Sequence, residues 1–447
     1  MNKLHYTLRV VMGIGLAVLA SPGLRAQNQN PSSTAGSSAE LAQRLEDLQK
    51  QIDRLQAELA AARKELSSQP ATATVPAPAG GAAPTTPAAA ETSPPPSSPG
   101  LVKSLLGSTS LSGFVDGYYG YNFNQPHNRT SSYRAFDGPT NQFALNLVEL
   151  NLDKTPDASN SRLGYHIALG FGQAMKVVNS AEPGEPNFAQ YLKEAYFSYL
   201  APVGKNGLQF DFGKFVTPHG AEVIETKDNW NYSRGILFTY AIPFYHFGLR
   251  TKYTFNSKYS LSGFVVNGWN NVVDNNTGKT YGVGFGWTPH KKFSLVQNYM
   301  AGPETAGINQ NWRQLSDTLV TISPTDKLSF IVNYDYGRGD RMTGLADPAF
   351  WTGIAGYVRY TFDERHTLAL RYEWFNDADG FTTGTAQQLK EFTGTFERRV
   401  AQHLLTRLEF RRDYSNQPTF IKGDSPAAAQ NAVAAGLIYI FDSREAQ

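Results

Sequence analysis

Apolar and polar residues alternate one by one along residues 161–172, the clearest pattern in the chain. Leu163, Tyr165 and Ile167 fall on one face of an extended strand, because strand side chains alternate with a period of two. Arg162 and His166 fall on the other face. The same alternation recurs along most of residues 109–441. Strands with one apolar and one polar face can close into a barrel with lipid outside and water inside.

About sixteen segments carry this alternation, and most have about ten residues, the length of a strand that crosses a membrane at a tilt. We predict strands at 109–123, 141–152, 161–172, 188–200, 207–217, 244–255, 258–269, 279–288, 292–301, 311–322, 327–337, 351–362, 366–377, 387–399, 402–414 and 430–441. In the second segment the apolar positions change phase, so we expect a β-bulge near Leu147.

The links between the predicted strands differ in length by parity. Links after even-numbered strands are short, as at 255–258, whereas links after odd-numbered strands are long and polar, as at 124–140. Outer-membrane barrels have short periplasmic turns and longer outer loops. The predicted fold is therefore all-β: a transmembrane, antiparallel, up-and-down β-barrel in a bacterial outer membrane, with both strand-array ends in the periplasm.

Three regions are expected before the barrel. Residues 1–26 have the charge, short apolar core and small residues of a signal peptide, and the core is too short for a membrane-spanning helix. Residues 39–67 carry apolar residues at alternating spacings of three and four, which predicts a periplasmic coiled-coil helix. Residues 68–108 are rich in Pro, Ala and Thr and are predicted to be an extended linker to the barrel at 109–441.

The heptads predict self-association, so we expect a homo-oligomer. The sequence does not fix the number of subunits, and a trimer is one of the possibilities. A single helix packed on the barrel rim is the alternative. Contact between the coiled coil and the cell wall also stays open. The expected partners are otherwise outer-membrane lipid and small hydrophilic solutes.

Composition excludes several other classes of protein. The formal net charge is +2, which gives no reason to expect a nucleic-acid partner. The chain has no cysteine, which excludes disulfides and thiolate sites. Two loops, around Asp274 and Asn376, pair oxygen ligands with a glycine, but such stretches form turns far more often than calcium sites. We expect no metal site and no cofactor.

Charged residues on the polar faces of the strands are the candidates for a pore-lining wall, because charge on a channel wall selects solutes. They are Arg162, His166, Arg250, Lys252, Arg359, Arg371, Glu373, Arg407, Glu409 and Arg411. Many of these side chains are expected to pair across strands and brace the barrel. Bases outnumber acids among them, so a weak preference for anions is a hypothesis.

Several segments, among them 112–124, 213–222 and 370–380, resemble the OmpL-like outer-membrane β-barrel porin family of Gram-negative bacteria. The resemblance covers the strand region and implies a diffusion pore, without specifying the solute. In general porins the third outer loop folds into the lumen, so by resemblance the link from Pro218 to Pro243 is the candidate constriction. Its charged residues are His219, Glu222, Glu225, Lys227, Asp228 and Arg234.

The function predicted is an outer-membrane porin that passes small hydrophilic solutes or ions passively. The alternative is a structural anchor or tether that acts through the coiled coil, with a narrow or plugged barrel. An enzyme such as an outer-membrane lipid hydrolase is not expected, because no strand histidine has a serine two positions on along the same face. We therefore predict no catalytic residues.

Overall fold

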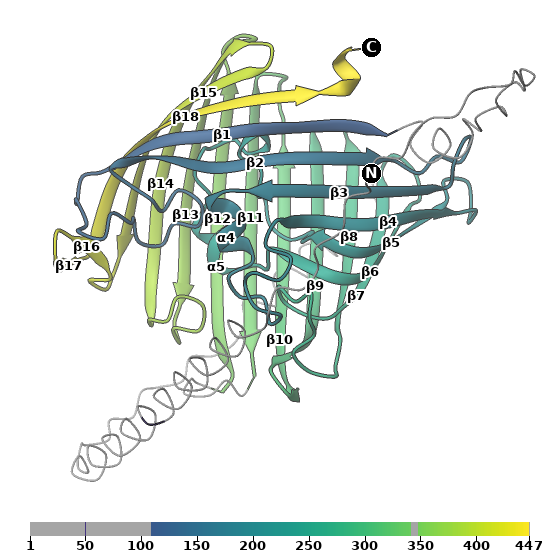
Figure 1. Cartoon of the computed structure of the whole chain (residues 1–447), viewed down its shortest axis with the longest axis horizontal. Helices are drawn as coiled ribbons and strands as arrows, with labels where there is room; N and C mark the ends of the chain where they lie inside the picture. The colour runs from purple at the N-terminus through teal and green to yellow at the C-terminus, as the bar shows by residue number, and fades with distance from the viewer. Residues whose placement is uncertain (1–49, 51–108, 341–346, 447) are drawn as a thin grey trace, which may run out of the picture. The chain divides into compact units, whose positions relative to one another are not determined.

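The computed structural model describes residue 50, residues 109–340 and residues 347–446. The predicted signal peptide, coiled coil and linker lie outside these residues, apart from Lys50. Sixteen antiparallel strands form one closed barrel in the order β1-β18-β15-β14-β13-β12-β11-β10-β9-β8-β7-β6-β5-β4-β3-β2 (Figure 1). Two further strands, β16 (Phe420–Lys422) and β17 (Ser425–Ala427), form a separate hairpin in the link between β15 and β18.

The barrel strands lie where the alternation predicts them. They are β1 (Ser110–Asn122), β2 (Gln142–Lys154), β3 (Leu163–Phe171), β4 (Leu192–Ala201), β5 (Leu208–Val216), β6 (Tyr245–Thr254), β7 (Tyr259–Val266), β8 (Thr280–His290), β9 (Phe293–Thr305), β10 (Ile308–Ile322), β11 (Leu328–Gly339), β12 (Ala349–Thr361), β13 (His366–Asp377), β14 (Gln387–Ala401), β15 (Leu404–Ser415) and β18 (Ala429–Asp442). The predicted closed antiparallel barrel is confirmed.

The links are long after odd-numbered predicted strands and short after even-numbered ones, as expected, at every hairpin except one. Strands β9 and β10 extend beyond their predicted ends and leave residues 306–307 between them, at the end of the barrel that otherwise carries the long links. Gly307 has φ +70° at this tight turn, a backbone conformation that glycine adopts without strain.

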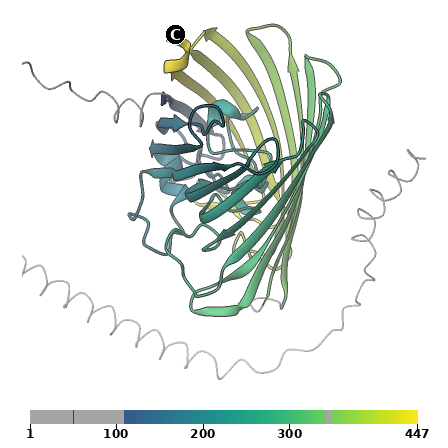
Figure 2. The ribbon, with the colours of Figure 1, turned by 90° about the vertical axis from the view of Figure 1, so that its right-hand side faces the viewer.

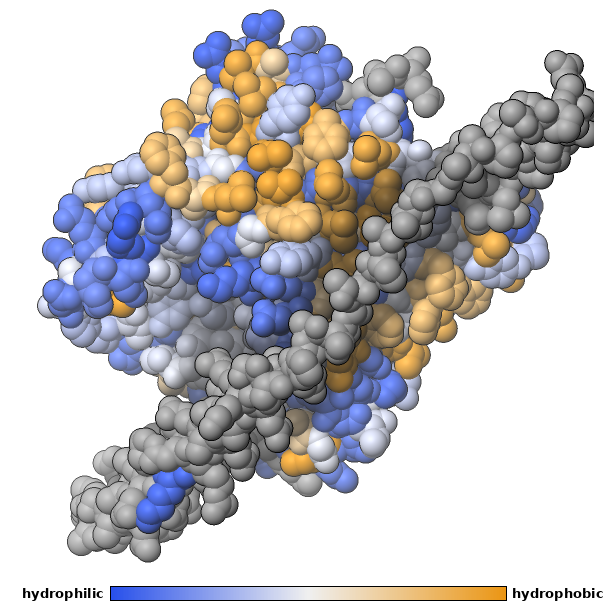
Figure 3. All heavy atoms as spheres, in the orientation of Figure 1, coloured by the Kyte–Doolittle hydropathy of each residue, from blue (hydrophilic) through white to orange (hydrophobic). Residues whose placement is uncertain are grey.

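The apolar faces of the strands point away from the barrel. Val283 on β8 is 58% exposed and Tyr372 on β13 is 52% exposed, whereas the alternate residues are buried or face the interior. In Figure 3 hydrophobic residues gather over the strand wall and hydrophilic residues gather at its ends. This outer surface suits lipid. Among the described residues, no helix has both the length and the apolar character needed to cross a membrane.

The barrel closes where the first strand pairs with the last. Residues 112–122 of β1 pair in unbroken antiparallel register with residues 432–442 of β18, so neither strand has a free edge. Figure 2, turned by 90°, shows the inclined strands and the chain segments between the walls. Two short helices, α4 (Gln173–Val178) and α5 (Ile236–Tyr240), lie inside: α4 contacts β2 and β3, and α5 contacts β12 and β13.

The bulge predicted near Leu147 is confirmed. Asp116 on β1 pairs with Leu147 and Gly117 pairs with Leu145, so Asn146 is the extra residue of β2. Its side chain is buried and donates hydrogen bonds to Asp116 (2.6 Å) and to Thr226 (3.0 Å), which belongs to the β5–β6 link. The bulge therefore fixes the phase of β2 and also places an amide where it holds a distant loop.

Deleting Asn146 should leave a barrel that assembles, because Leu145, Leu147 and Val148 then alternate without a bulge and every outward residue of β2 keeps its face. Deleting Leu150 instead should prevent assembly, because Asn151 then turns toward lipid if the bulge is kept and Glu149 does so if the bulge is lost. Heat-dependent gel mobility after refolding in detergent distinguishes the two. Equal behaviour of the two deletions would contradict this account of the bulge.

Candidate functional site

The link of residues 218–243, here called L3, joins β5 to β6 but reaches the opposite wall of the barrel. It contains a short 3-10 helix, Thr226–Asp228, and the helix α5. Its side chains and backbone contact residues on β1, β11, β13 and β15. Figure 1 shows α5 between the near and far strands. L3 therefore folds into the interior, where its backbone is removed from bulk water.

Wall carboxylates accept hydrogen bonds from the backbone N–H groups of L3. Glu409 on β15 accepts from Tyr232 (2.6 Å) and Ser233 (3.0 Å). Glu373 on β13 accepts from Ile236 and Leu237, which are the first residues of α5. Unbonded N–H groups and a partial positive charge are found at a helix N-terminus, so a carboxylate stabilises it.

Wall arginines donate to the backbone carbonyls of the same loop. Arg407 on β15 donates to the carbonyl oxygens of Thr226 (2.6 Å) and Asn229 (2.7 Å). Arg411 donates to the carbonyl of Arg234 at 2.6 Å. A guanidinium has five donors, so one side chain can serve several carbonyls. Together these bonds satisfy backbone groups that no strand pairs with.

Arg371 on β13 makes the central ionic contact between the wall and L3. Its Nη1 lies 2.6 Å from Oε1 of Glu222 in L3, and its Nε lies 2.7 Å from Oε1 of Glu391 on β14. Nη1 also donates to the carbonyl of Ser233 at 2.6 Å. The Arg371 side chain is 0% exposed. A buried charge of this kind is tolerated because each of its partners is in place.

The other predicted L3 residues have different surroundings. Glu225 forms an ion pair with Lys193 on β4, and Lys227 pairs with its neighbour Asp228 at 2.6 Å on a partly exposed part of the loop. Arg234 is buried and donates to carbonyls within L3, including that of Tyr232 at 2.6 Å. His219 is buried, and burial lowers its pKa to about 3, so its ring is uncharged at neutral pH.

Sequence reasoning missed several residues that hold L3. Asp116 on β1 accepts hydrogen bonds from the hydroxyl groups of Thr226 and Tyr232, at 2.5 and 2.8 Å. At the start of the loop, Asn298 donates to the carbonyl of Pro218 and Asn333 accepts from the N–H of Ala221, each at 3.0 Å. Asp116 lies on the polar face of its strand, and this position alone predicts that its carboxylate faces the interior. Short polar residues within strands carry no sign of the loop they hold.

The strand region, a closed barrel with a charged interior and an inward loop, is similar to a known family and to solved structures. Residues 108–441 match the family described as "Putative beta-barrel porin-2, OmpL-like". The chain belongs to this family. It is therefore an outer-membrane β-barrel channel for passive diffusion and not an enzyme.

Solved porins share the fold of this porin at low sequence identity. The anion-selective porin from Comamonas acidovorans is 10% identical with a TM-score of 0.51, covering 75% of this chain and 99% of the other. The trimer form of OmpT from Vibrio cholerae is 12% identical with a TM-score of 0.51, covering 74% of this chain and 99% of the other. A search of curated proteins found no match.

The interior of this porin differs on the two sides of L3. Beneath L3 lie five of the predicted wall residues, all nearly fully buried: Arg371, Glu373, Arg407, Glu409 and Arg411. On the other side, Arg250 and Lys252 of β6 line a cavity of about 450 Å³ together with Gln209, Ser260 and Ser262. Gly284 and Gly286 on β8 also line it and have no side chains to fill it.

The remaining wall residues lie away from L3's buried contacts or at its edge. The Nη1 of Arg162 donates to the carbonyl of Leu200 at 3.0 Å. His166 lies 3.2 Å from Asp153 and 3.4 Å from Glu194. Arg359 lies 6.0 Å above the ring of Trp230 in L3. The structure thus brings together the residues of β13 and β15 but not the whole predicted set.

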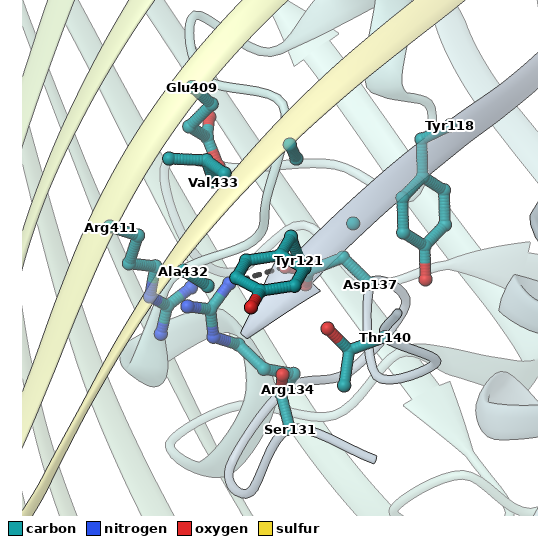
Figure 4. Close-up of a pocket in the computed structure, with 12 residues that line it drawn as sticks. Tyr118, Tyr121, Ser131, Arg134, Asp137, Thr140, Glu409, Arg411, Ala432 and Val433 are labelled. Carbon is teal, nitrogen blue, oxygen red and sulfur yellow. Dashed lines mark hydrogen bonds and ion pairs between the residues drawn. The ribbon is translucent and has the colours of Figure 1, made fainter. Parts of the chain in front are cut away.

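The first long link, residues 123–141, bonds to inward-facing residues of β15 and β18. Arg134 forms ion pairs with Asp137 in the same loop (2.5 Å) and with Asp413 on β15 (3.0 Å). Figure 4 shows Arg134 and Arg411 close together, with Tyr118 and Thr140 on the other side of a small cavity. That cavity has a volume of about 10 Å³, which is too small for a solute larger than water.

Replacing Arg371 by alanine should reduce the free energy of unfolding by about 3–5 kcal/mol, because Glu222 and Glu391 then stay buried without their partner. The same change should increase the single-channel conductance, since L3 loses its central contact with the wall. The thermal unfolding midpoint and planar-bilayer recordings measure the two effects. Arg398→Ala, at an exposed position of β14, is the control; the prediction is wrong if both variants behave alike.

Proposed function

We propose that this porin passes small hydrophilic anions in preference to cations, along the sector bounded by β5 to β9. The observation that carries the proposal is the cavity lined by Arg250 and Lys252. Its single lining carboxylate, Asp211, is 2.8 Å from Nε of Arg250. Lys252 is exposed and makes no ion pair with any described residue, so the cavity carries a net positive charge.

The charge state of the wall supports the same conclusion. Three of the predicted wall cations, Arg162, Lys252 and Arg359, are at least partly exposed and have no carboxylate partner among the described residues. The predicted wall acids, Glu373 and Glu409, are instead buried and bonded to the backbone of L3. Cations therefore outnumber acids among the predicted wall residues that stay exposed to a solute.

We propose L3 as the constriction, because it occupies the half of the interior next to β13 and β15. Its exposed charges, Lys227 and Asp228, neutralise each other. The loop then limits solute size, while Arg250 and Lys252 on the facing wall provide the electrostatic preference. The comparison with an anion-selective porin concerns the fold alone at 10% identity, so the argument for anions rests on the charges of this chain.

The tether function stays a second candidate, because the heptads at 39–67 and the periplasmic position proposed for them are independent of the barrel. We propose a homo-oligomer held by this segment, with contact to the cell wall open. A porin lacking residues 39–67 should keep its single-channel conductance. Loss of cell-envelope attachment in the same variant, measured by sedimentation with the cell wall, would support the tether.

Reversing the charge at Lys252 provides the test of anion preference. A unit charge about 4 Å from an ion changes its energy in water by about 1 kcal/mol, so Lys252→Glu should lower the anion-to-cation permeability ratio by about fivefold or more. The reversal potential in a salt gradient measures this ratio. Lys291→Glu, in the exposed β8–β9 turn, is the control. Cation preference in the unmodified porin would reject the proposal.

A further inference from the structure

Two cations stand on the outer surface of the barrel, where the neighbouring side chains are apolar. Lys390 on β14 and Arg412 on β15 are exposed and share their strand faces with outward-pointing aromatic residues. These neighbours are exposed to similar degrees: Phe392 45%, Phe396 41%, Phe410 42% and Tyr414 44%. Both cations therefore face away from the channel, so neither acts on permeating solutes.

The strand register shows how far the two cations lie from the middle of the barrel wall. Lys390 pairs with Trp374 on one side and with Tyr414 on the other. Arg412 pairs with Phe392 and Asn431, one step nearer the middle. Such a step is two residues, about 7 Å along a strand. The next two rows contain Gly394 with Phe410 and Phe396 with Leu408, so both cations stand at the upper border of the apolar band.

This border is the one nearest the long loops. Strand β14 begins with Gln387, directly after the link of residues 378–386, and Lys390 is the fourth residue of this strand. In outer-membrane barrels the long loops lie outside the cell and aromatic residues mark the membrane interface. Trp374 and Tyr414, on either side of Lys390, fit such an interface. The two cations are thus level with the headgroups of the outer leaflet.

The charges of both side chains lack a partner within the described protein. Neither forms an ion pair there, and the guanidinium of Arg412 donates its one recorded hydrogen bond to Oδ1 of Asn431, a neutral group, at 3.0 Å. Arg412 is the diagonal neighbour of Lys390 across the strand pair. Diagonal neighbours are about 7–8 Å apart, a distance that two long cationic side chains can close on a single anion.

We propose that Lys390 and Arg412 form a binding site for the phosphate group of a lipid in the outer leaflet. Phosphate is the matching anion: a guanidinium binds it through two parallel N–H donors and an ammonium adds a point charge. The apolar rows below, Phe392, Phe396 and Phe410, contact the acyl chains of the same lipid. A lipid satisfies both parts of this surface, whereas a free phosphate ion would use the cations alone.

The test compares binding of phosphorylated lipid A with binding of its dephosphorylated form to the folded, full-length porin in detergent, by native mass spectrometry. We expect the phosphorylated lipid to bind more tightly. Lys390→Gln with Arg412→Gln should weaken that binding by about 30-fold, about fivefold for each cation lost near a membrane surface. Lys390→Arg with Arg412→Lys keeps both charges and should bind within a few-fold of the unmodified porin.

Arg398→Gln provides the matched control, because Arg398 is exposed on the same strand at its other end. This variant should bind phosphorylated lipid A as the unmodified porin does. Heat-dependent gel mobility confirms that every variant is a folded barrel. Equal binding of the two lipid forms, unchanged binding by the Lys390/Arg412 double variant, or complete displacement of the lipid by inorganic phosphate would each overturn the proposal.

Discussion

The interior of this barrel is organised by one requirement: the backbone of L3 must find hydrogen-bond partners although it has no neighbouring strand. Buried N–H and C=O groups are costly when unpaired. In the wall each strand satisfies the next, but a loop folded inward cannot use that ladder. Glu373 and Glu409 accept from its N–H groups, and Arg407 and Arg411 donate to its carbonyls. Half of the charged interior therefore has a structural role.

This division of labour separates stability from selectivity. The charges of β13 and β15 are buried and bonded to L3, so altering them disturbs the loop before it alters the field in the channel. Arg250 and Lys252 on β6 carry no such burden, because among the described residues neither forms a hydrogen bond or an ion pair with L3, and Arg250 pairs instead with Asp211. In this sector Asn298 is bonded to the start of L3, whereas Arg250 and Lys252 can vary with little effect on the loop.

The sequence predicts the wall of this protein better than its interior. The alternation of side chains with a period of two determines which face of the strand each residue occupies. The strands, the bulge at Asn146 and the inward face of Arg407 follow from this alternation. It does not state which inward residue meets the loop. Glu222 and Arg371 are 149 positions apart, and no local pattern connects them. The inward fold of L3 was expected by resemblance to general porins rather than from its own residues.

Register irregularities also hid part of the site. Between β3 and β4 the pairing shifts at Ala168 and Leu169, and Lys193 and Glu194 are consecutive yet both buried. Strict alternation would place one of them toward lipid, which is why Lys193 was not expected as a partner of Glu225. Asn298 and Asn333 were missed for a different reason: an amide on a strand face is common, and its role depends on a loop that comes from elsewhere in the chain.

The contacts of L3 have a consequence for how the cylinder is completed. The loop bonds to Asp116 on β1 and to Glu409 on β15, which lie on either side of the seam made by the pairing of β1 with β18. Its wall partners on β13 and β15 are synthesised after it, and the last strand closes the ring. The hydrogen bonds of the loop connect β1 to β15 across this seam, so they stabilise the closed ring of strands as well as the loop itself.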